Sequence, residues 1–150
     1  MLFETADTES YCRLMVESFQ GFTGQRLTDE RDVAQGIWRA PQPIISHGIE
    51  ADPIFRYGNA AALTLWEMDW AGFTRLPSRL SAEPDDAAQE ERNALLRAAM
   101  SGGYVDGLCG VRVSASGRRF EIRDTVLWNV VDAAGVQHGQ AALIRDWRYL

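Results

Sequence analysis

The sequence has few of the residues that metal sites and disulfide frameworks require. It contains only two cysteines and two histidines. Cys12 and Cys109 lie far apart and form no CxxC pair, which argues against both a disulfide framework and a zinc site. Small buried thiols are their ordinary interpretation. His47 and His138 are too few for a site with several histidine ligands, although His47 could serve as the single axial ligand of a haem.

Long apolar segments and basic clusters are also missing. No run of about 18 apolar residues occurs, and the N-terminal stretch MLFETADTES has no basic region followed by an apolar one, so we expect no membrane span, no signal peptide and a cytoplasmic protein. The net charge is −6, and Arg118-Arg119 is the only adjacent basic pair. Because phosphate backbones are bound by basic patches, we expect no nucleic-acid partner and no membrane partner.

Familiar catalytic signatures are absent as well: the chain has no GxSxG, no P-loop and no Rossmann fingerprint. What remains is an ordinary globular composition. The chain has 150 residues, of which 46% are hydrophobic and 24% charged. This length and balance predict a single domain with one substantial core.

The order of predicted elements indicates an α+β fold. Apolar residues at helical spacing, N-capping residues and terminal glycines or prolines predict helices over residues 8–22, 29–38, 60–66, 69–73 and 84–100. Two short strands are expected at 44–47 and 54–57, and alternation in the last third predicts a three-stranded meander. We therefore expect an antiparallel sheet with short helices on one face. An N-terminal helical extension over residues 1–40 would precede a domain over residues 41–150.

The segment IFRYGNAAALTLW resembles the PAS signature, in which a short strand ends in an asparagine, here Asn59, that caps a helix rich in small residues. Together with SHG, LPSRLSAEP, GRRFEI, VLWNVV and GQAAL, it makes the chain similar to the MEKHLA family. That family is a PAS-like domain of small bacterial proteins and of plant class III homeodomain–leucine zipper proteins. The resemblance is strong over about residues 47–147, although the name-giving peptide is not present verbatim.

The resemblance implies a module that senses a ligand or dimerises, and it transfers no catalytic residue. A transcriptional role does not carry over, because the chain has neither homeodomain nor zipper. The flavin-binding LOV branch of the PAS fold needs a cysteine in a GRNCRFLQ-like helix, which is absent, so we expect no blue-light photochemistry. Neither the residues nor the family identifies a cofactor.

In a PAS-like fold the inner face of the sheet and the small helices enclose a cavity. Alternation along the longest strand predicts that its inward face carries Phe120, Ile122, Asp124, Val126 and Trp128. An isolated buried carboxylate is costly, so Asp124 either pairs with one of Arg79, Arg112 and Arg123 or is turned to solvent by a bulge. The outer face is expected to receive the first helix, against Leu127 and Val131.

Several polar and aromatic residues are candidates for lining the cavity. His47 could be a hydrogen-bonding or acid–base group, or a histidine satisfied by the backbone. Arg79 would suit a ligand carboxylate, or it forms a surface pair with Glu83. Clustered aromatic residues could stack on a ligand or simply fill the core. The predicted ligand-binding residues are His47, Tyr57, Trp66, Arg79, Glu83, Arg112, Asp124, Trp128 and Gln140.

These features predict a sensory or interaction module that binds a small molecule, a protein partner or both. The apolar stripe of the first helix further suggests a homodimer. An alternative is a small enzyme that uses His47, Arg79 and Asp124 in the cavity. A third possibility is a purely structural interaction module, which would have a filled core and no cavity.

Overall fold

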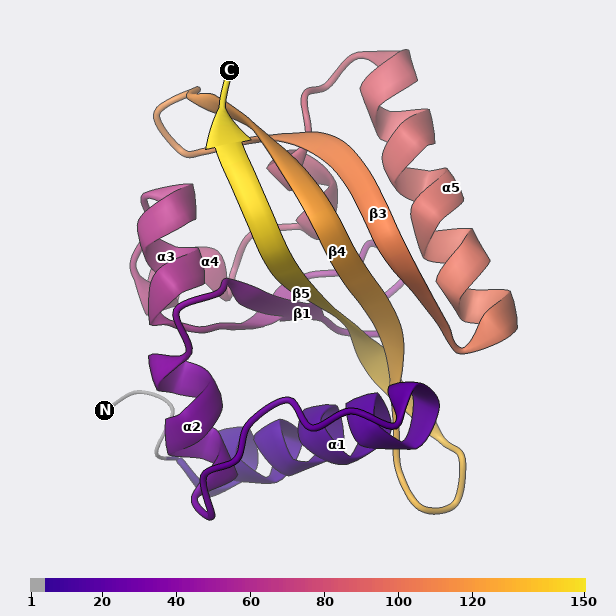
Figure 1. Cartoon of the computed structure of the whole chain (residues 1–150). Coiled ribbons are helices and arrows are strands. Elements are labelled where there is room, and N and C mark those ends of the chain that lie inside the picture. The colour runs from indigo at the N-terminus through magenta and orange to yellow at the C-terminus, as the bar shows by residue number, and fades with distance from the viewer. Residues whose placement is uncertain (1–4) are drawn as a thin grey trace.

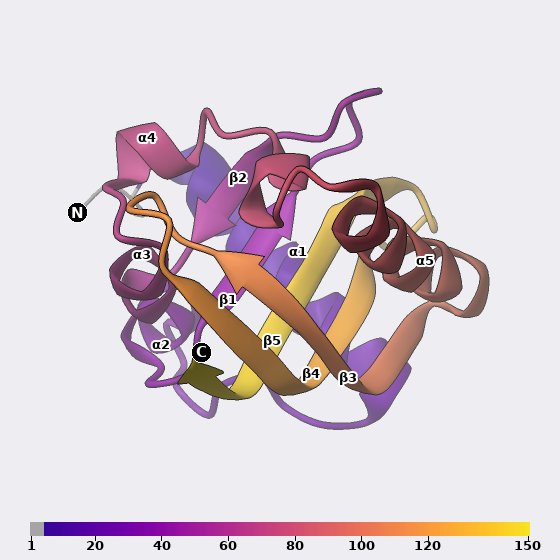
Figure 2. The same ribbon diagram turned by 90° about the horizontal axis from the view of Figure 1, so that it is seen from above.

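The computed structural model describes residues 5–150, which form a five-stranded antiparallel sheet with helices on both faces (Figures 1 and 2). The strand order is β2-β1-β5-β4-β3. The strands are β1 (Ile44–His47), β2 (Phe55–Gly58), β3 (Tyr104–Val113), β4 (Arg119–Val131) and β5 (Gln137–Tyr149). The helices are α1 (Ala6–Thr23), α2 (Val33–Arg39), α3 (Ala60–Trp66), α4 (Trp70–Phe73), the short 3₁₀ helix η2 (Ser78–Ser81) and α5 (Asp86–Gly102). This confirms the α+β fold that the sequence predicts.

One face of the sheet, which we call the α1 face, is covered by α1 and α2 (Figure 1). The apolar stripe of α1 is buried against Val126, Trp128 and Val130 of β4. Trp128 packs edge-on against Phe19, with ring centroids 4.9 Å apart, and its indole N–H donates to the Met15 carbonyl at 3.2 Å. Hydrophobic burial therefore drives the docking of α1, and the indole hydrogen bond adds a polar contact between the helix and the sheet.

The opposite face, which we call the α5 face, is covered by α3, α4, η2 and α5 (Figure 2). Phe55, Phe73 and Phe120 pack with Trp66 at the α3 end of this face. At the α5 end the buried side chains are smaller and fewer, chiefly Ala99, Leu127 and Ala142. The two ends therefore leave space between them, below α5.

Asn59 caps α3, as its place in the PAS-like segment predicts, and it also bonds to α2 and β1. Its side-chain oxygen accepts from the backbone N–H of Ala62, which caps α3, and of Ile44, which begins β1, both at 3.0 Å. Its amide N–H₂ donates to the carbonyls of Ile37 and Gln42, both at 2.9 Å. The side chain is fully buried, so all of its hydrogen-bonding capacity is used inside the protein.

The prediction that Phe120, Ile122, Val126 and Trp128 share one face of β4 is wrong, because the strand changes face at Asp124. This residue has a φ of 48°, a left-handed conformation that interrupts strand alternation. Phe120 and Ile122 before it lie on the α5 face, whereas Val126, Trp128 and Val130 after it lie on the α1 face. Leu127 correspondingly contacts the α5 side, with Ala99 and Ala142, and not α1 as the sequence predicts.

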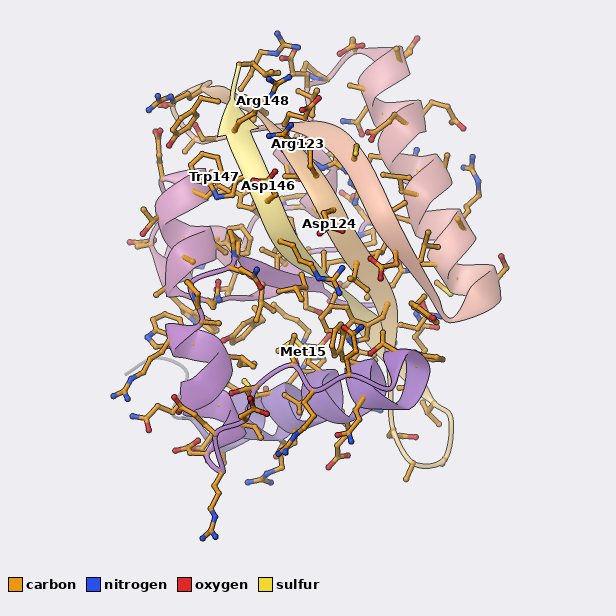
Figure 3. All side chains as sticks on the ribbon, in the orientation of Figure 1. Met15, Arg123, Asp124, Asp146, Trp147 and Arg148 are labelled. Carbon is orange, nitrogen blue, oxygen red and sulfur yellow. The ribbon has the colours of Figure 1, made fainter. Side chains whose placement is uncertain are left out.

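Asp124 is turned to solvent, which is the second of the two predicted alternatives. Its side chain is 61% exposed and lies 3.6 Å from the Arg145 guanidinium. None of the three arginines proposed as its partner pairs with it within residues 5–150. Figure 3 places Asp124 on the part of β4 that α1 leaves uncovered. There, Arg123 pairs with Asp146 at 3.2 Å.

Predicted boundaries differ from the structure at several elements, among them α2, α5 and the loop after Leu76. The predicted second helix starts at 29, but α2 starts at Val33 because Asp32 caps it by accepting from the Gln35 backbone N–H at 3.1 Å. Pro84 precedes α5, whose N-cap is Asp85. The predicted loop after Leu76 contains η2. At α2 and α5 the capping aspartates, Asp32 and Asp85, thus determine where the helix begins.

The stripe on which the predicted homodimer rests is already buried within the chain, since Tyr11, Cys12, Met15 and Phe19 are buried against the sheet and α2. A dimer through α1 stays a prediction and would have to use the exposed side of the helix. Residues 1–4 of the predicted extension lie outside the described residues. Within the described chain, no helix combines the length and the apolar character that a membrane crossing requires.

Candidate ligand-binding site

A cavity of about 60 Å³ lies below α5, between that helix and the α5 face of the sheet. Its walls also include residues of α3 and η2. Most of the lining is aliphatic, including Ile45, Leu95, Leu127 and Ile144. A cavity of this size has room for a few water molecules. The prediction of a completely filled core, which belonged to the purely structural alternative, does not describe this region.

His47, at the end of β1, is buried at the rim of this cavity. Its Nδ1 lies 3.0 Å from the Gly48 carbonyl. Because a carbonyl only accepts, Nδ1 carries the proton and the neutral ring has its lone pair on Nε2. Nε2 is buried and has no hydrogen-bond partner among the described residues. Burial, opposed by the Gly48 carbonyl and assisted by repulsion from Arg92, lowers the pKa of His47.

Gly139 explains how the backbone of β1 comes so close to β5 beside His47. A Cβ at this position would meet the His47 carbonyl oxygen at 2.2 Å. Only glycine permits this approach. The close pairing places Gln140, the next residue, opposite His47. The Gln140 amide donates to the Leu96 carbonyl and to Asn129 Oδ1, both at 3.1 Å, so it fastens β5 to α5.

Arg92 is a buried cation on the side of α5 that faces the sheet, with only 6% of its surface exposed. It follows the helical spacing of Leu95, Leu96 and Ala99, which lie three, four and seven residues later. Its guanidinium donates to the Ser78 hydroxyl of η2 and, at 3.1 Å, to Asn93 Oδ1. Burial, followed by repulsion from Arg112, lowers the pKa of Arg92 to about 10, so the side chain stays charged at neutral pH.

A second arginine, Arg112 of β3, lines the same cavity. It is also buried, and it donates to Glu91 Oε2 at 3.1 Å. Glu91 is the only carboxylate that pairs with either of the two cavity arginines among residues 5–150. This end of the cavity therefore has two guanidinium groups and one paired carboxylate.

Trp66, at the end of α3, brings a further unused donor to the lining. Its indole Nε1 is buried and has no acceptor among the described residues. A buried indole N–H usually finds a partner, and leaving such a donor unpaired costs about 1–3 kcal/mol. The cavity thus combines one unused donor, at Trp66, with one unused acceptor, at His47.

A groove of about 300 Å³ adjoins the cavity on the outside. It lies between the loop after β1 and the C-terminal half of α5, and its exposed apolar residues are Ile49 and Met100. His47, Leu96 and Gln140 line both the groove and the cavity. These three residues separate the cavity from the surface.

The structure brings four of the predicted site residues together in the cavity: His47, Trp66, Arg112 and Gln140. The other five lie elsewhere. Tyr57 is buried on the α1 face, where its ring packs edge-on against Trp70, and Trp128 also lies on that face. Asp124 is exposed for the reason given above.

The predicted surface pair between Arg79 and Glu83 is wrong, whereas a ligand carboxylate on Arg79 stays a prediction, outside this cavity. Arg79 is half exposed and pairs with Asp52 at 3.2 Å, and Glu83 pairs with Arg119 instead. The predicted enzyme required His47, Arg79 and Asp124 in one cavity, and the last two do not line it. The described residues also contain no group of three or more His, Cys, Asp or Glu that could hold a metal ion.

Sequence reasoning missed Arg92 and the two serines of η2, Ser78 and Ser81, as lining residues. A signal for Arg92 existed, because it occupies the apolar stripe of α5, where a solvated arginine is not expected. No comparable signal marks the serines. They reach the cavity because η2 replaces the predicted loop, and a 3₁₀ turn aligns residues three apart.

Comparison with known proteins agrees with this architecture. The family model described as the MEKHLA domain matches residues 9–149. The PAS domain of a protein from Colwellia psychrerythraea is similar in structure, with a TM-score of 0.63 and 14% identity over 78% of this chain and 92% of that one. A search of curated proteins finds no match.

Two light-oxygen-voltage proteins are also similar in structure. One is an RNA-binding light-oxygen-voltage receptor, with a TM-score of 0.61 and 20% identity over 76% of this chain and 31% of that one. The other is a light-oxygen-voltage domain studied with a flavin analogue, with a TM-score of 0.59 and 14% identity over 81% of this chain and 86% of that one. At these identities the likeness shows the fold alone.

Proposed function

Because the chain belongs to the MEKHLA domain family, we propose that it is a sensory module that binds a small molecule in the cavity below α5. The observation that carries the proposal is the pair of unused polar atoms, His47 Nε2 and Trp66 Nε1, on residues that line one cavity. Unpaired buried polar groups are costly in a folded protein. A ligand that pairs with them would recover that free energy, which is the usual design of a small-molecule site.

The ligand is small and is not a flavin. Cofactor pockets are usually about 300–1,000 Å³, whereas this cavity measures about 60 Å³. The cysteine chemistry of a flavin photoreceptor also has no counterpart here. Cys109 is exposed on β3 and does not line the cavity, and Cys12 is buried on the α1 face.

The signal would leave through α5. Gln140 and Arg92 link this helix to the rest of the fold at the cavity, through the Leu96 carbonyl and the Ser78 hydroxyl. The pair of Arg112 with Glu91 is a third polar link there. A ligand that competes for these groups changes how α5 is held. The exposed side of α5 is then the surface that a protein partner would detect.

The proposal is tested by native mass spectrometry of the chain purified from its own host. We expect a population heavier than the bare 16.8 kDa chain by the mass of one small molecule, which is lost on denaturation. Trp66→Phe keeps the aromatic packing but removes the unused donor, so it should lower the bound fraction. Trp70→Phe, outside the cavity lining, is the matched control. A bare chain that captures a protein from the host instead would favour the interaction module.

A further inference from the structure

Charge at the cavity is unbalanced, and this imbalance defines a ligand class. Arg92 and Arg112 both line the cavity and are both buried. Glu91 pairs with Arg112, while Arg92 forms no ion pair with any carboxylate of residues 5–150 and bonds only to neutral oxygens. Asp52 and Glu91 act on Arg92 only from beyond ion-pair distance. A buried cation without a carboxylate in direct contact is unfavourable. One negative charge beside Arg92 would supply the ion-pair partner that its guanidinium lacks.

The form of the donors favours a carboxylate over a spherical anion. A guanidinium presents parallel N–H groups that match the two oxygens of a carboxylate. The unused Trp66 N–H supplies a further donor in the same lining. The rest of the wall is aliphatic, which suits a methyl or methylene group and does not suit a doubly charged phosphate.

His47 fixes the proton balance of such a complex. Its Nε2 carries a lone pair, which repels a carboxylate oxygen unless a proton lies between them. Binding therefore takes up one proton from solvent, and Nε2–H then donates to the ligand oxygen. The charged and titratable groups that act on His47 are Arg92 of α5 and Glu50 of the following loop.

We propose that the ligand of this cavity is a small monocarboxylate, with its oxygens on Arg92 and its apolar end against Leu95, Leu127 and Ile144. This inference rests on the proposed function, since it names the ligand class of the same cavity. A volume of about 60 Å³ has room for a few water molecules, which favours an acid as small as formate or acetate. Longer acids would require α5 to move away from the sheet.

The test is titration of the whole chain with sodium formate, acetate and propionate, followed by ¹H–¹⁵N NMR of the indole and guanidinium N–H groups. Sodium chloride and sodium phosphate at equal ionic strength are the reference anions. We expect saturable shifts of the Trp66 indole N–H and the Arg92 Nε–H with acetate or formate. We expect weaker binding of propionate and no saturable shift with chloride or phosphate.

Two variants separate the bound charge from the fold. Arg92→Met keeps the length of the side chain and removes its charge, and it should weaken acetate binding by about tenfold or more, because a hydrogen bond to a charged group contributes at least that much. Arg97→Met removes an exposed cation from the same helix and should leave acetate binding unchanged. If Arg92→Met does not fold, Ala142→Val, which narrows the cavity and keeps Arg92, must also weaken binding.

The outcomes distinguish this inference from the function on which it rests. The proposal that the ligand is a carboxylate is overturned if acetate binds equally to the wild type and to Arg92→Met. It is also overturned if phosphate binds saturably at Arg92. A neutral molecule retained in native mass spectrometry also overturns the carboxylate proposal, but it supports the proposed function of a ligand-binding module. A chain that binds none of the carboxylates and retains no molecule from its host overturns both.

Discussion

The two faces of one sheet are built differently. On the α1 face, Met15, Phe19 and Trp128 interlock, and the indole N–H has its acceptor. On the α5 face, the same strands meet small side chains, two buried arginines and a cavity of about 60 Å³. A face that only has to hold the fold together can be packed to completion. The other retains space lined by two unused polar atoms, which reduce stability and are useful only if something binds there. The α1 face also has an unused hydroxyl, that of Tyr57, but this residue does not line the cavity.

Trp128→Ala, on the α1 face, is the test of this comparison for which we expect the largest loss of stability. It removes a fully buried aromatic side chain and leaves the Met15 carbonyl without its donor. We expect the free energy of unfolding to fall by about 3–5 kcal/mol, measured by urea denaturation. Leu127→Ala, its neighbour on the cavity face, should cost less, since part of its surroundings is already empty. Equal costs would show that the two faces are packed alike.

Asn59→Ala tests the hydrogen bonds by which one side chain connects elements on the two faces of the sheet. The substitution leaves two buried N–H groups and two carbonyls without their partner. We expect a loss of about 3 kcal/mol, because each unsatisfied buried group costs about 1 kcal/mol or more. Thermal unfolding followed by circular dichroism measures it. Thr5→Ala, which removes only the exposed cap of α1, should cost about 1 kcal/mol or less. A similar loss for the two variants would mean that Asn59 is merely another cap.

The comparison of the two faces also shows how much of the structure the sequence predicts. The PAS-like segment around Asn59 predicts β2, α3 and their capping, because a local pattern determines them. Two of the residues that line the cavity, His47 and Gln140, follow from the ends of predicted strands. The residues of β4 after Asp124 could not be placed correctly, since a single left-handed residue reverses every later side chain. That conformation is unusual for a non-glycine residue, and alternation offers no sign of it.

Arg92 shows a different limit. Its spacing places it on the buried stripe of α5, yet arginine is mostly found exposed. Its role depends on Ser78, fourteen residues earlier in the chain. That contact exists only because η2 folds under α5. Local sequence patterns do not encode such contacts, which is why the site is less predictable than the fold.

Adjacent alanines on β5 allow a matched test with effects of opposite sign. Ala141 packs with the buried cluster of the α1 face, although it also borders the cavity, and Ala142 packs with the cluster of the α5 face. Ala141→Val should lower the free energy of unfolding by about 1–3 kcal/mol, because a filled core does not accept extra methyl groups. Ala142→Val should raise it by about 0.5–1 kcal/mol, because the methyl groups enter the cavity and valine suits a strand. Urea denaturation of both variants measures the difference, and destabilisation by Ala142→Val would contradict the open space.

The smallest effect is the dependence of stability on pH that His47 imposes on the α5 face. Burial lowers the pKa of His47 below its ordinary 6.5. Above pH 6.5 the imidazole is mostly neutral in both the folded and the unfolded state, so it contributes nothing to the pH dependence of stability. As the pH falls below it, the unfolded chain binds a proton that the folded chain does not, so the free energy of unfolding decreases. Between pH 7 and 5.5 we expect a loss of up to about 1 kcal/mol from this group.

Urea denaturation at both pH values measures this contribution as the difference between wild type and His47→Gln, which does not titrate. His138→Gln, at the other histidine, should retain the His47 contribution. Saturating acetate should reduce the loss, because a bound carboxylate favours the protonated imidazole and so raises the pKa of His47 in the complex. If acetate leaves the pH dependence of the wild type unchanged, the ligand does not contact His47, and the unused Nε2 has some other purpose.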